Sequence, residues 1–247
     1  MNIQLAETDS TNRYLKQLCL DRGEAVEELT TVTATCQTAG RGQRGAGWEA
    51  EAGKNLTFSF VLYPHFLEAR HQFLLSQIVS LSVKEELDEY VSDVSIKWPN
   101  DIYRKEKKIC GILIENCLDG KLIAQSIAGI GVNVNQEQFQ SDAPNPVSLR
   151  QITGQSYDCS LLLAGIMNRV AGYYHLLQSD VSGEQARYIA HRYASALFRR
   201  TGYHRYADAS GEFLARLLWV EVDGRFVLED EAGTIRSYLF KEVRYIL

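Results

Sequence analysis

The sequence lacks the patterns that mark disulfide-rich proteins, transition-metal enzymes and membrane spans. Its five cysteines are scattered, odd in number and without a C-x-x-C pair, which argues for reduced, mostly buried thiols rather than disulfides or a zinc site. The five histidines form no H-E-x-x-H pattern, which disfavours a transition-metal enzyme. No apolar run approaches the ~20 residues that span a bilayer, and the N-terminus has neither the basic start nor the apolar core of a signal peptide. These absences predict a cytoplasmic protein with no membrane partner.

An excess of positive charge is absent as well. The 247 residues carry a formal net charge of −5, with 31 acidic and 26 basic side chains. Proteins that bind nucleic acid without sequence preference usually have a basic surface, because the neutralisation of phosphates supplies the affinity. We therefore expect no nucleic-acid partner, and any phosphate that the chain binds should belong to a small ligand.

The chain divides into two parts of different secondary structure. Before residue 198, predicted strands and helices follow one another, and tight turns such as Asp119-Gly120 favour a largely antiparallel sheet. From residue 203 onward the sequence shows no helical period, only short β segments separated by turns. We expect an α/β (α+β) fold. Residues 1–198 would form a mixed, largely antiparallel sheet with flanking helices, and residues 201–247 a small SH3-like β-barrel.

The glycine loop, residues 37–48, is the most informative segment of the chain. They include four glycines, two arginines and one tryptophan, and they lie between two predicted strands. Glycines let the backbone approach a ligand closely, and guanidinium groups recognise phosphate and carboxylate in a planar, bidentate way. Such a loop is suited to close over an anion, with the tryptophan as a flat stacking face. A flexible surface loop with two solvated arginines is the plainer alternative, and the segment by itself does not exclude it.

Three further motifs lie at chain positions that suit ligand binding. Residues 9–12 precede the first predicted helix, and residues 96–101 end a strand at Pro99, which has no N–H to donate to a ladder. Residues 108–115 and 129–133 read as paired strands that carry a lysine and several glycines. Each motif also has a structural interpretation, as helix cap, edge-strand charge, solvated hairpin tip or β-bulge. Their joint occurrence in this order is far more specific than any one of them.

Together the motifs resemble the biotin–protein ligase family from about residue 3 to the C-terminus. The matching patterns are D-S-T-N, Q-x-A-G-R-G-x-x-G, K-W-P-N-D, K-x-x-G-I-L-x-E and G-I-G-x-N. The resemblance implies a catalytic α/β domain with a mixed sheet and a small SH3-like C-terminal domain. Some members also carry an N-terminal winged helix-turn-helix and act as repressors. Because the chain starts at the first catalytic strand, we expect the monofunctional type.

The resemblance implies a reaction in two steps. The biotin carboxylate attacks the α-phosphorus of ATP, which gives biotinyl-5′-AMP and pyrophosphate with the help of Mg²⁺. A lysine of a biotin carboxyl carrier domain, part of a biotin-dependent carboxylase, then attacks the mixed anhydride. Because two anions must meet, the site needs fixed positive charge and backbone donors. Mg²⁺ would arrive with the nucleotide, with Asp101 as a candidate protein ligand. The resemblance leaves open whether the chain forms a homodimer.

The resemblance also implies roles for individual residues. Lys108 would contact the biotin carboxylate and the α-phosphate, Arg41 would clamp the same region, and Lys97 would add a second cation. The expected biotin-binding residues are Ser10, Thr11, Asn12, Gln37, Arg41, Gly42, Gln43, Lys108 and Gly111. The expected ATP-binding residues are Arg41, Arg44, Trp48, Asn100, Asp101, Gly129, Gly131 and Asn133. A loop at residues 136–146 would fold over adenine.

One position departs from the family pattern. Gln43 stands where many members have arginine, so it can hydrogen-bond but carries no charge, and the neighbouring Arg44 would have to supply that charge. All assigned residues precede residue 145, so we expect residues 201–247 to serve transfer to the carrier more than formation of the adenylate. Acidic side chains at 229–231 would then meet the carrier. The alternative is that the small barrel only covers apolar surface of the catalytic part.

Three other functions compete with this interpretation. Lipoate–protein ligases and octanoyltransferases share the catalytic fold, but they are expected to show an R-x-x-G-G-G-x-x-x-H type loop, and no histidine precedes His65. A DNA-binding, biotin-responsive regulator is disfavoured by the acidic charge balance. A catalytically inert binding module is disfavoured because Arg41, Lys97 and Lys108 are all present.

Overall fold

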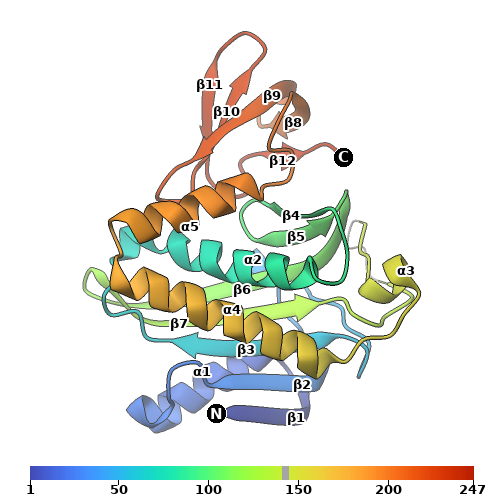
Figure 1. The fold of residues 1–247 in the computed structure, drawn as a ribbon, viewed down its shortest axis with the longest axis vertical. Coiled ribbons are helices and arrows are strands. Elements are labelled where there is room, and N and C mark those ends of the chain that lie inside the picture. Colours follow the sequence, from blue (N-terminus) through green and yellow to red (C-terminus); the bar gives the residue numbers. More distant parts are fainter. Residues whose placement is uncertain (141–144) are drawn as a thin grey trace.

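A seven-stranded sheet forms the larger part of the computed structural model, which describes residues 1–140 and 145–247 (Figure 1). Its strands are β1 (Asn2–Thr8), β2 (Thr31–Gln37), β3 (Leu56–Leu62), β4 (Val94–Lys97), β5 (Asp101–Arg104), β6 (Lys107–Asp119) and β7 (Leu122–Val132). They lie in the order β1-β2-β3-β7-β6-β5-β4. β1 pairs with β2 in parallel, and every other recorded pairing in this sheet is antiparallel. The prediction of a mixed, largely antiparallel sheet is confirmed.

Helices cover both faces of this sheet. The helical segments are α1 (Thr11–Arg22), η1 (Gly23–Ala25), η2 (Gln43–Gly45), η3 (Ala69–His71), α2 (Phe73–Leu87), α3 (Leu149–Thr153), α4 (Cys159–Ser179) and α5 (Glu184–Ser195). In Figure 1, α2 and α4 lie across the near face, and α5 follows above them. α1 packs on the opposite face, against β2, β3 and β7. Among the described residues, no helix combines the length and the apolar character that crossing a bilayer requires.

The alternation of side chains along β3 decides which residues face which helices. Leu56, Phe58 and Phe60 belong to the large core that includes α2, whereas Val61 packs in a smaller cluster with Leu15 of α1. Successive side chains of a strand point to opposite faces, so a strand between two helical layers is buried along its whole length. All seven residues of β3 are buried for this reason.

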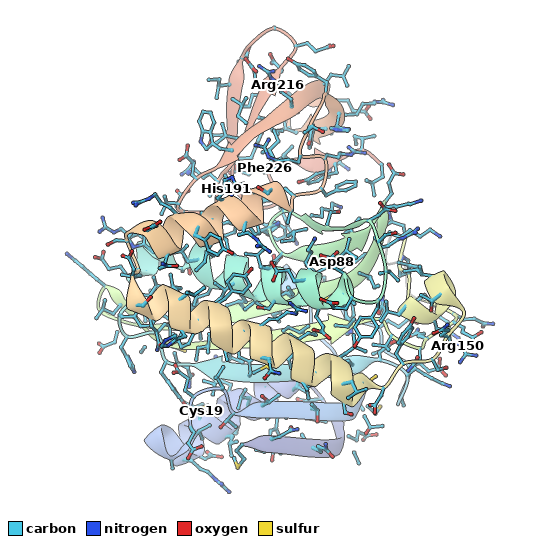
Figure 2. All side chains as sticks on the ribbon, viewed as in Figure 1. Cys19, Asp88, Arg150, His191, Arg216 and Phe226 are labelled. Carbon is cyan, nitrogen blue, oxygen red and sulfur yellow. The ribbon has the colours of Figure 1, made fainter. Side chains whose placement is uncertain are left out.

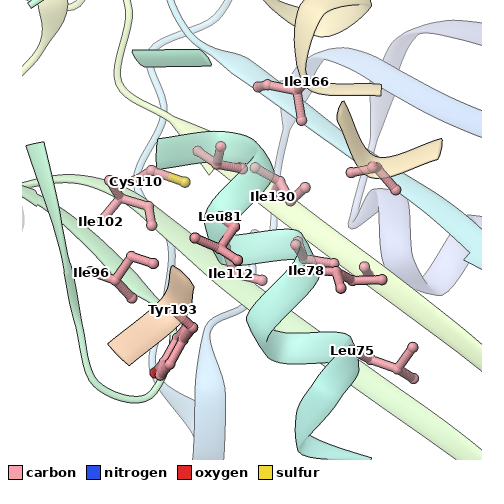
Figure 3. Close-up of a cluster of buried hydrophobic side chains, with 14 of the residues drawn as sticks. Leu75, Ile78, Leu81, Ile96, Ile102, Cys110, Ile112, Ile130, Ile166 and Tyr193 are labelled. Atoms are coloured by element: carbon pink, nitrogen blue, oxygen red, sulfur yellow. The ribbon is translucent and has the colours of Figure 1, made fainter. Parts of the chain in front are cut away.

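The large core fixes the sheet from the side of α2. Leu75, Ile78 and Leu81 of α2 lie against side chains of the central strands, such as Ile130 of β7 (Figure 3). Tyr193 of α5 closes the same cluster and is fully buried. Burial of one aliphatic side chain of this size stabilises a fold by roughly 1.5–3 kcal/mol. This packing holds the sheet in place, so the residues on its other face have a fixed support.

The C-terminal residues form a second sheet of five antiparallel strands. They are β8 (His204–Asp208), β9 (Gly211–Val220), β10 (Phe226–Asp230), β11 (Ile235–Tyr238) and β12 (Arg244–Tyr245), in the order β11-β10-β9-β8-β12. The small all-β part is thus confirmed. Its closure into an SH3-like barrel stays a prediction, because no pairing between β11 and β12 is recorded for the described residues. The division into units at residues 198–201 also stays a prediction.

The two sheets meet at Trp98, which belongs to the K-W-P-N-D motif. Its ring stacks on Phe226 with centroids 4.9 Å apart, and its Nε1 donates to the carbonyl oxygen of Gly224 at 2.9 Å. Figure 2 labels Phe226 at the base of the second sheet, where it approaches the larger one. The indole of Trp98 therefore lies at the contact between the two sheets. Because this indole is held in place, the backbone that leads to Asn100 and Asp101 is held in place as well.

Candidate active site

A cavity of about 220 Å³ opens on the face of the larger sheet that carries α1, beside the N-terminus of this helix. The residues that line it are Ser10, Thr11, Asn12, Gln37, Arg41, Gly42, Gln43, Ala46, Gly47, Trp48, Asn100, Asp101, Lys108, Gly111, Ile112, Leu113, Gly129, Ile130, Gly131, Phe240 and Lys241. Segments that are far apart in the sequence meet here. Each of the four motifs singled out in the sequence contributes to this one cavity.

Three glycines on neighbouring strands leave space on the sheet for two side chains that line the cavity. Gly111 of β6 lies opposite Gly131 of β7, and the indole of Trp48 lies over both. A Cβ atom at Gly131 would stand 2.3 Å from Cε2 of Trp48, and one at Gly129 would stand 2.1 Å from Oδ1 of Asn12. Atoms that are not bonded cannot approach so closely, so any side chain at these positions would expel the indole or the amide. The glycines therefore form a bare strip on the sheet.

Polar uncharged groups gather at one end of the cavity. Ser10 is the N-cap residue of α1 but makes no side-chain cap bond, so its hydroxyl stays available to the cavity. The backbone N–H and the hydroxyl of Thr11 both donate to Oε1 of Gln37, at 2.8 and 3.1 Å. The hydroxyl of Ser59 lies 2.5 Å from Oδ1 of Asn12. This end offers both donors and acceptors, held in place by a buried network.

Charged groups gather at the other end. Nζ of Lys108 forms an ion pair with Oδ1 of Asp101 at 2.7 Å and lies 5.7 Å from the ring centroid of Trp48. The side-chain amide of Asn100 is buried and donates to a main-chain carbonyl of β6 at 2.9 Å, which fixes the start of β5. Arg41 is exposed and lines the same cavity. The arrangement suits a ligand with a polar uncharged head and an anionic end.

Lys97 does not line the cavity. β4 is an edge strand of the sheet, and none of its residues is among those that line the cavity. Nζ of Lys97 donates to the hydroxyl of Tyr103 at 2.9 Å and lies 5.1 Å from the ring centroid of Tyr245. Burial lowers the pKa of this ammonium group; Asp101 opposes that shift, and Lys108 adds to it. The expected catalytic role of Lys97 stays a prediction.

Two of the expected ATP-binding residues are not among the described residues that line the cavity. Asn133 lies apart from it, and the side chain of the other, Arg44, is not described. Asn133 is buried directly after the end of β7, and its Oδ1 has no hydrogen-bond partner among the described residues. The side chain of Arg44 lies outside the described part of the structure, although its backbone forms part of η2. Of the loop expected to cover adenine, residues 141–144 lie outside the described residues.

Some lining and supporting residues were missed by the sequence interpretation. Phe240 and Lys241 reach the cavity from the segment that follows β11, which no motif marks. Lys241 adopts φ 74°, a conformation that is uncommon for residues with a side chain. Ser59 of β3 donates a hydrogen bond to the side chain of Asn12, and Glu115 of β6 accepts one from it. The position of Ser59 on a strand whose side chains alternate between two faces was the signal that could have identified it. Phe240 and Lys241 come from the part of the chain that was expected to serve transfer more than formation of the adenylate, and that expectation stays a prediction.

Of the acidic side chains at 229–231, which were expected to meet the carrier, two form ion pairs within the chain. Glu229 forms an ion pair with Arg216 at 2.5 Å, and Asp230 with Arg236 at 2.9 Å. Hydrogen bonds from the backbone of Thr234 and from Arg236 lower the pKa of Asp230. Glu229 thus links β10 to β9, and Asp230 serves the β10–β11 turn. The expectation that this surface meets the carrier stays a prediction.

Comparisons with known proteins agree with the geometry. The sequence pattern of the biotin/lipoate A/B protein ligase family matches residues 5–133. The chain belongs to this family. The bifunctional ligase/repressor BirA of Salmonella typhimurium is 32% identical over 70% of the chain and 53% of that relative. The biotin–[acetyl-CoA-carboxylase] ligase of Paracoccus denitrificans is 33% identical over 62% of the chain and 65% of that relative.

The chain thus spans between half and two thirds of the length of these curated relatives. Among solved structures, the biotin protein ligase from Aquifex aeolicus in complex with biotin and ATP superimposes with a TM-score of 0.80. It is 28% identical, and the match covers 99% of both chains. The family match contains all four motifs and ends at Asn133, so the contribution of Lys241 comes from the structure alone.

The glycine strip gives a direct prediction. Gly131→Ala should displace the indole of Trp48, because the added methyl group would overlap Cε2. Overpacking costs about 1–3 kcal/mol, so proteolytic cleavage within residues 37–54 should accelerate about 5- to 150-fold. Gly172→Ala in α4 is the control, because a Cβ there meets nothing within 4 Å. A cleavage rate of Gly131→Ala equal to that of the control would contradict the packing of Trp48 against the strip.

Proposed function

We propose that the chain activates biotin with ATP to biotinyl-5′-AMP and transfers the biotinyl group to a lysine of a biotin carboxyl carrier domain. One observation carries the proposal: a single cavity has polar donors and acceptors at one end and Lys108, Arg41 and Asp101 at the other. Biotin has a ureido ring at one end and a carboxylate at the other. The similarity to the biotin–[acetyl-CoA-carboxylase] ligase of Paracoccus denitrificans and to the Aquifex aeolicus complex with biotin and ATP supports this substrate.

The polar end favours biotin over lipoate or octanoate. A ureido ring presents two N–H donors and one carbonyl acceptor, and a buried pocket must satisfy all of them. Ser10, Thr11 and Gln37 bring hydroxyl, backbone and amide groups to this end. The dithiolane ring of lipoate and the alkyl chain of octanoate would leave these groups without partners, at a cost of about 1–3 kcal/mol for each unsatisfied group.

The charged end supports formation of the adenylate. A carboxylate oxygen of biotin would attack the α-phosphorus of ATP, with pyrophosphate as the leaving group. Lys108 would hold the carboxylate and the α-phosphate together and would stabilise the charge that develops on the phosphoryl oxygens. In the ligand-free chain, Asp101 orients this ammonium at 2.7 Å. Exposed Arg41, at the glycine loop, would then close over the anions.

The residues fit a Mg²⁺ ion that arrives with the nucleotide. Mg²⁺ is usually bound by one or two carboxylates together with substrate phosphates, rather than by a cage of protein ligands. Among the described residues, no group of three His, Cys, Asp or Glu side chains is placed to hold a metal, and Asp101 is the one carboxylate of the cavity lining. Asp101 would hold the ion, which would neutralise part of the phosphate charge.

In the second step, the amine of the acceptor lysine would attack the acyl carbon of the adenylate, and AMP would leave. The carrier domain is the proposed partner, and the cytoplasm is the proposed compartment. Lys241 would add a cation to the nucleotide from the segment between β11 and β12, since it lines the cavity. The second sheet would thereby take part in the first step.

The proposed function is tested by the release of pyrophosphate from MgATP in the presence of biotin, lipoate or octanoate. Biotin should support release, and the other two acids should not. Release with lipoate or octanoate but not with biotin would favour the related acyl ligases of the same family. No release with any of the three acids would contradict an adenylate-forming ligase.

The two neighbouring lysines of β6 provide a matched pair of variants. Lys108 lines the cavity, whereas Lys107 is exposed and faces away, because successive side chains of a strand alternate. Lys108→Ala should slow biotin-dependent pyrophosphate release about 100- to 1000-fold, as for other groups that stabilise developing charge. Lys107→Ala should keep the wild-type rate. Equal losses in the two variants would contradict the assignment of Lys108.

The role of Lys241 predicts a selective effect on the nucleotide. Lys241→Ala should raise the KM for ATP about tenfold or more, the effect of losing a hydrogen bond to a charged group, and should leave the KM for biotin unchanged. Lys121→Ala, an exposed lysine at the turn after β6, is the control. An unchanged KM for ATP in Lys241→Ala would show that this lysine does not contact the nucleotide.

A further inference from the structure

A second polar cluster lies beside the active-site cavity and is centred on Gln136. This side chain is 1% exposed. Its Oε1 accepts hydrogen bonds from the backbone N–H of Glu51 at 3.0 Å and from Nδ2 of Asn55 at 2.5 Å. Its Nε2 donates to Oε1 of Glu49 at 3.1 Å and to the carbonyl oxygen of Gln138 at 2.8 Å. A side-chain amide has two donor hydrogens and two acceptor lone pairs, so the hydrogen-bonding capacity of Gln136 is used in full.

The cluster joins two segments that flank the cavity. Residues 49–55 directly follow Trp48, and residues 134–140 follow the strand end that carries Gly131. Three further bonds connect the same two segments. They are Asn135 N–H to the carbonyl oxygen of Lys54 at 2.8 Å, Val134 N–H to Oδ1 of Asn55 at 2.9 Å, and Gln140 N–H to Oε1 of Glu49 at 2.9 Å. The side chain of Gln136 makes three of the bonds between the two segments.

The connection has a mechanical consequence. A displacement of Trp48 moves Glu49, the next residue, and Glu49 is bonded both to Nε2 of Gln136 and to the backbone of Gln140. A buried amide that loses one of its partners pays the full cost of an unsatisfied polar group, so the network tends to form or break as a unit. The position of one segment therefore favours one position of the other.

We propose that Gln136 is a positioning residue that couples the glycine loop to residues 134–140. A ligand that contacts residues 41–48 would then raise the affinity for a ligand that contacts the end of β7, and the reverse. The proposal rests on the proposed function, in which biotin and ATP are the two ligands. Gln136 lies in no motif of the sequence and beyond residue 133, where the family match ends. Coupling of this kind is a free energy shared by two binding events, so it is the same whichever ligand binds first.

The test is a titration of biotin binding by calorimetry, with and without saturating adenosine 5′-(α,β-methylene)triphosphate and Mg²⁺. The ratio of the two biotin affinities measures the coupling. For the unchanged chain the ratio should lie at about 5 to 150, the usual range for linked sites. Gln136→Leu should bring the ratio close to one. Gln138→Ala and Gln140→Ala are matched controls, because these exposed glutamines contribute only backbone groups to the network and should keep the wild-type ratio.

A second pair of variants covers the case in which Gln136→Leu does not fold. Gln136→Glu places a carboxylate against that of Glu49 and should abolish the coupling. Glu49→Gln combined with Gln136→Glu exchanges the amide and the carboxylate, and it should recover part of the lost ratio because one donor again faces one acceptor. A residue with a merely structural role would lower stability without changing the ratio.

The outcomes separate this proposal from the proposed function. A chain that binds neither biotin nor the nucleotide analogue contradicts the proposed function, and the coupling with it. A chain that binds both ligands but keeps its coupling ratio in Gln136→Leu or in Gln136→Glu contradicts the coupling alone. So does a chain that binds both ligands with a ratio of one before any substitution.

Discussion

The absence of side chains at Gly111, Gly129 and Gly131 is the constraint on which the site depends. These positions lie on neighbouring strands of the larger sheet and on its face opposite α2. Where other strand residues would fill the space, the bare backbone admits the indole of Trp48 and the amide of Asn12. The glycine loop can therefore lie directly on the sheet, and the cavity forms between them.

The same sheet serves stability on one face and chemistry on the other. Its apolar face packs on α2, α4 and α5, so the strand positions are fixed before any ligand binds. On the other face, the pair of Lys108 and Asp101 at 2.7 Å holds a cation that is already partly neutralised. An incoming carboxylate or phosphate would have to compete with Asp101 for the ammonium. A divalent cation that binds to Asp101 would relieve this competition, which gives a physical reason for nucleotide and metal to act together.

Most of the residues that the sequence motifs singled out line one cavity, because spacing along strands carries part of the information. Gly129 and Gly131 share one face through alternation, and Gly111 lies opposite Gly131. Lys108 reaches the same face only because the pairing of β6 with β5 shifts by one residue at Ile109, which local spacing does not reveal. Lys97 belongs to an equally clear motif, but it lies on an edge strand with its ammonium group over the ring of Tyr245. The order of strands in a sheet cannot be read from local spacing. The approach of Lys241 and the network around Gln136 depend on contacts between distant segments that no local pattern encodes. β8 and β12 are short and polar, so they showed no strand signal.

The central claim is that this cavity joins biotin to a protein lysine at the expense of ATP. The most direct measurement is the intact mass of a biotin carboxyl carrier domain after incubation with the chain, biotin and MgATP. The account predicts a single biotin-sized increment that requires ATP and does not appear when the acceptor lysine is replaced. A carrier domain that keeps its mass in the complete mixture, or that gains a lipoyl group when both acids are offered, would contradict it.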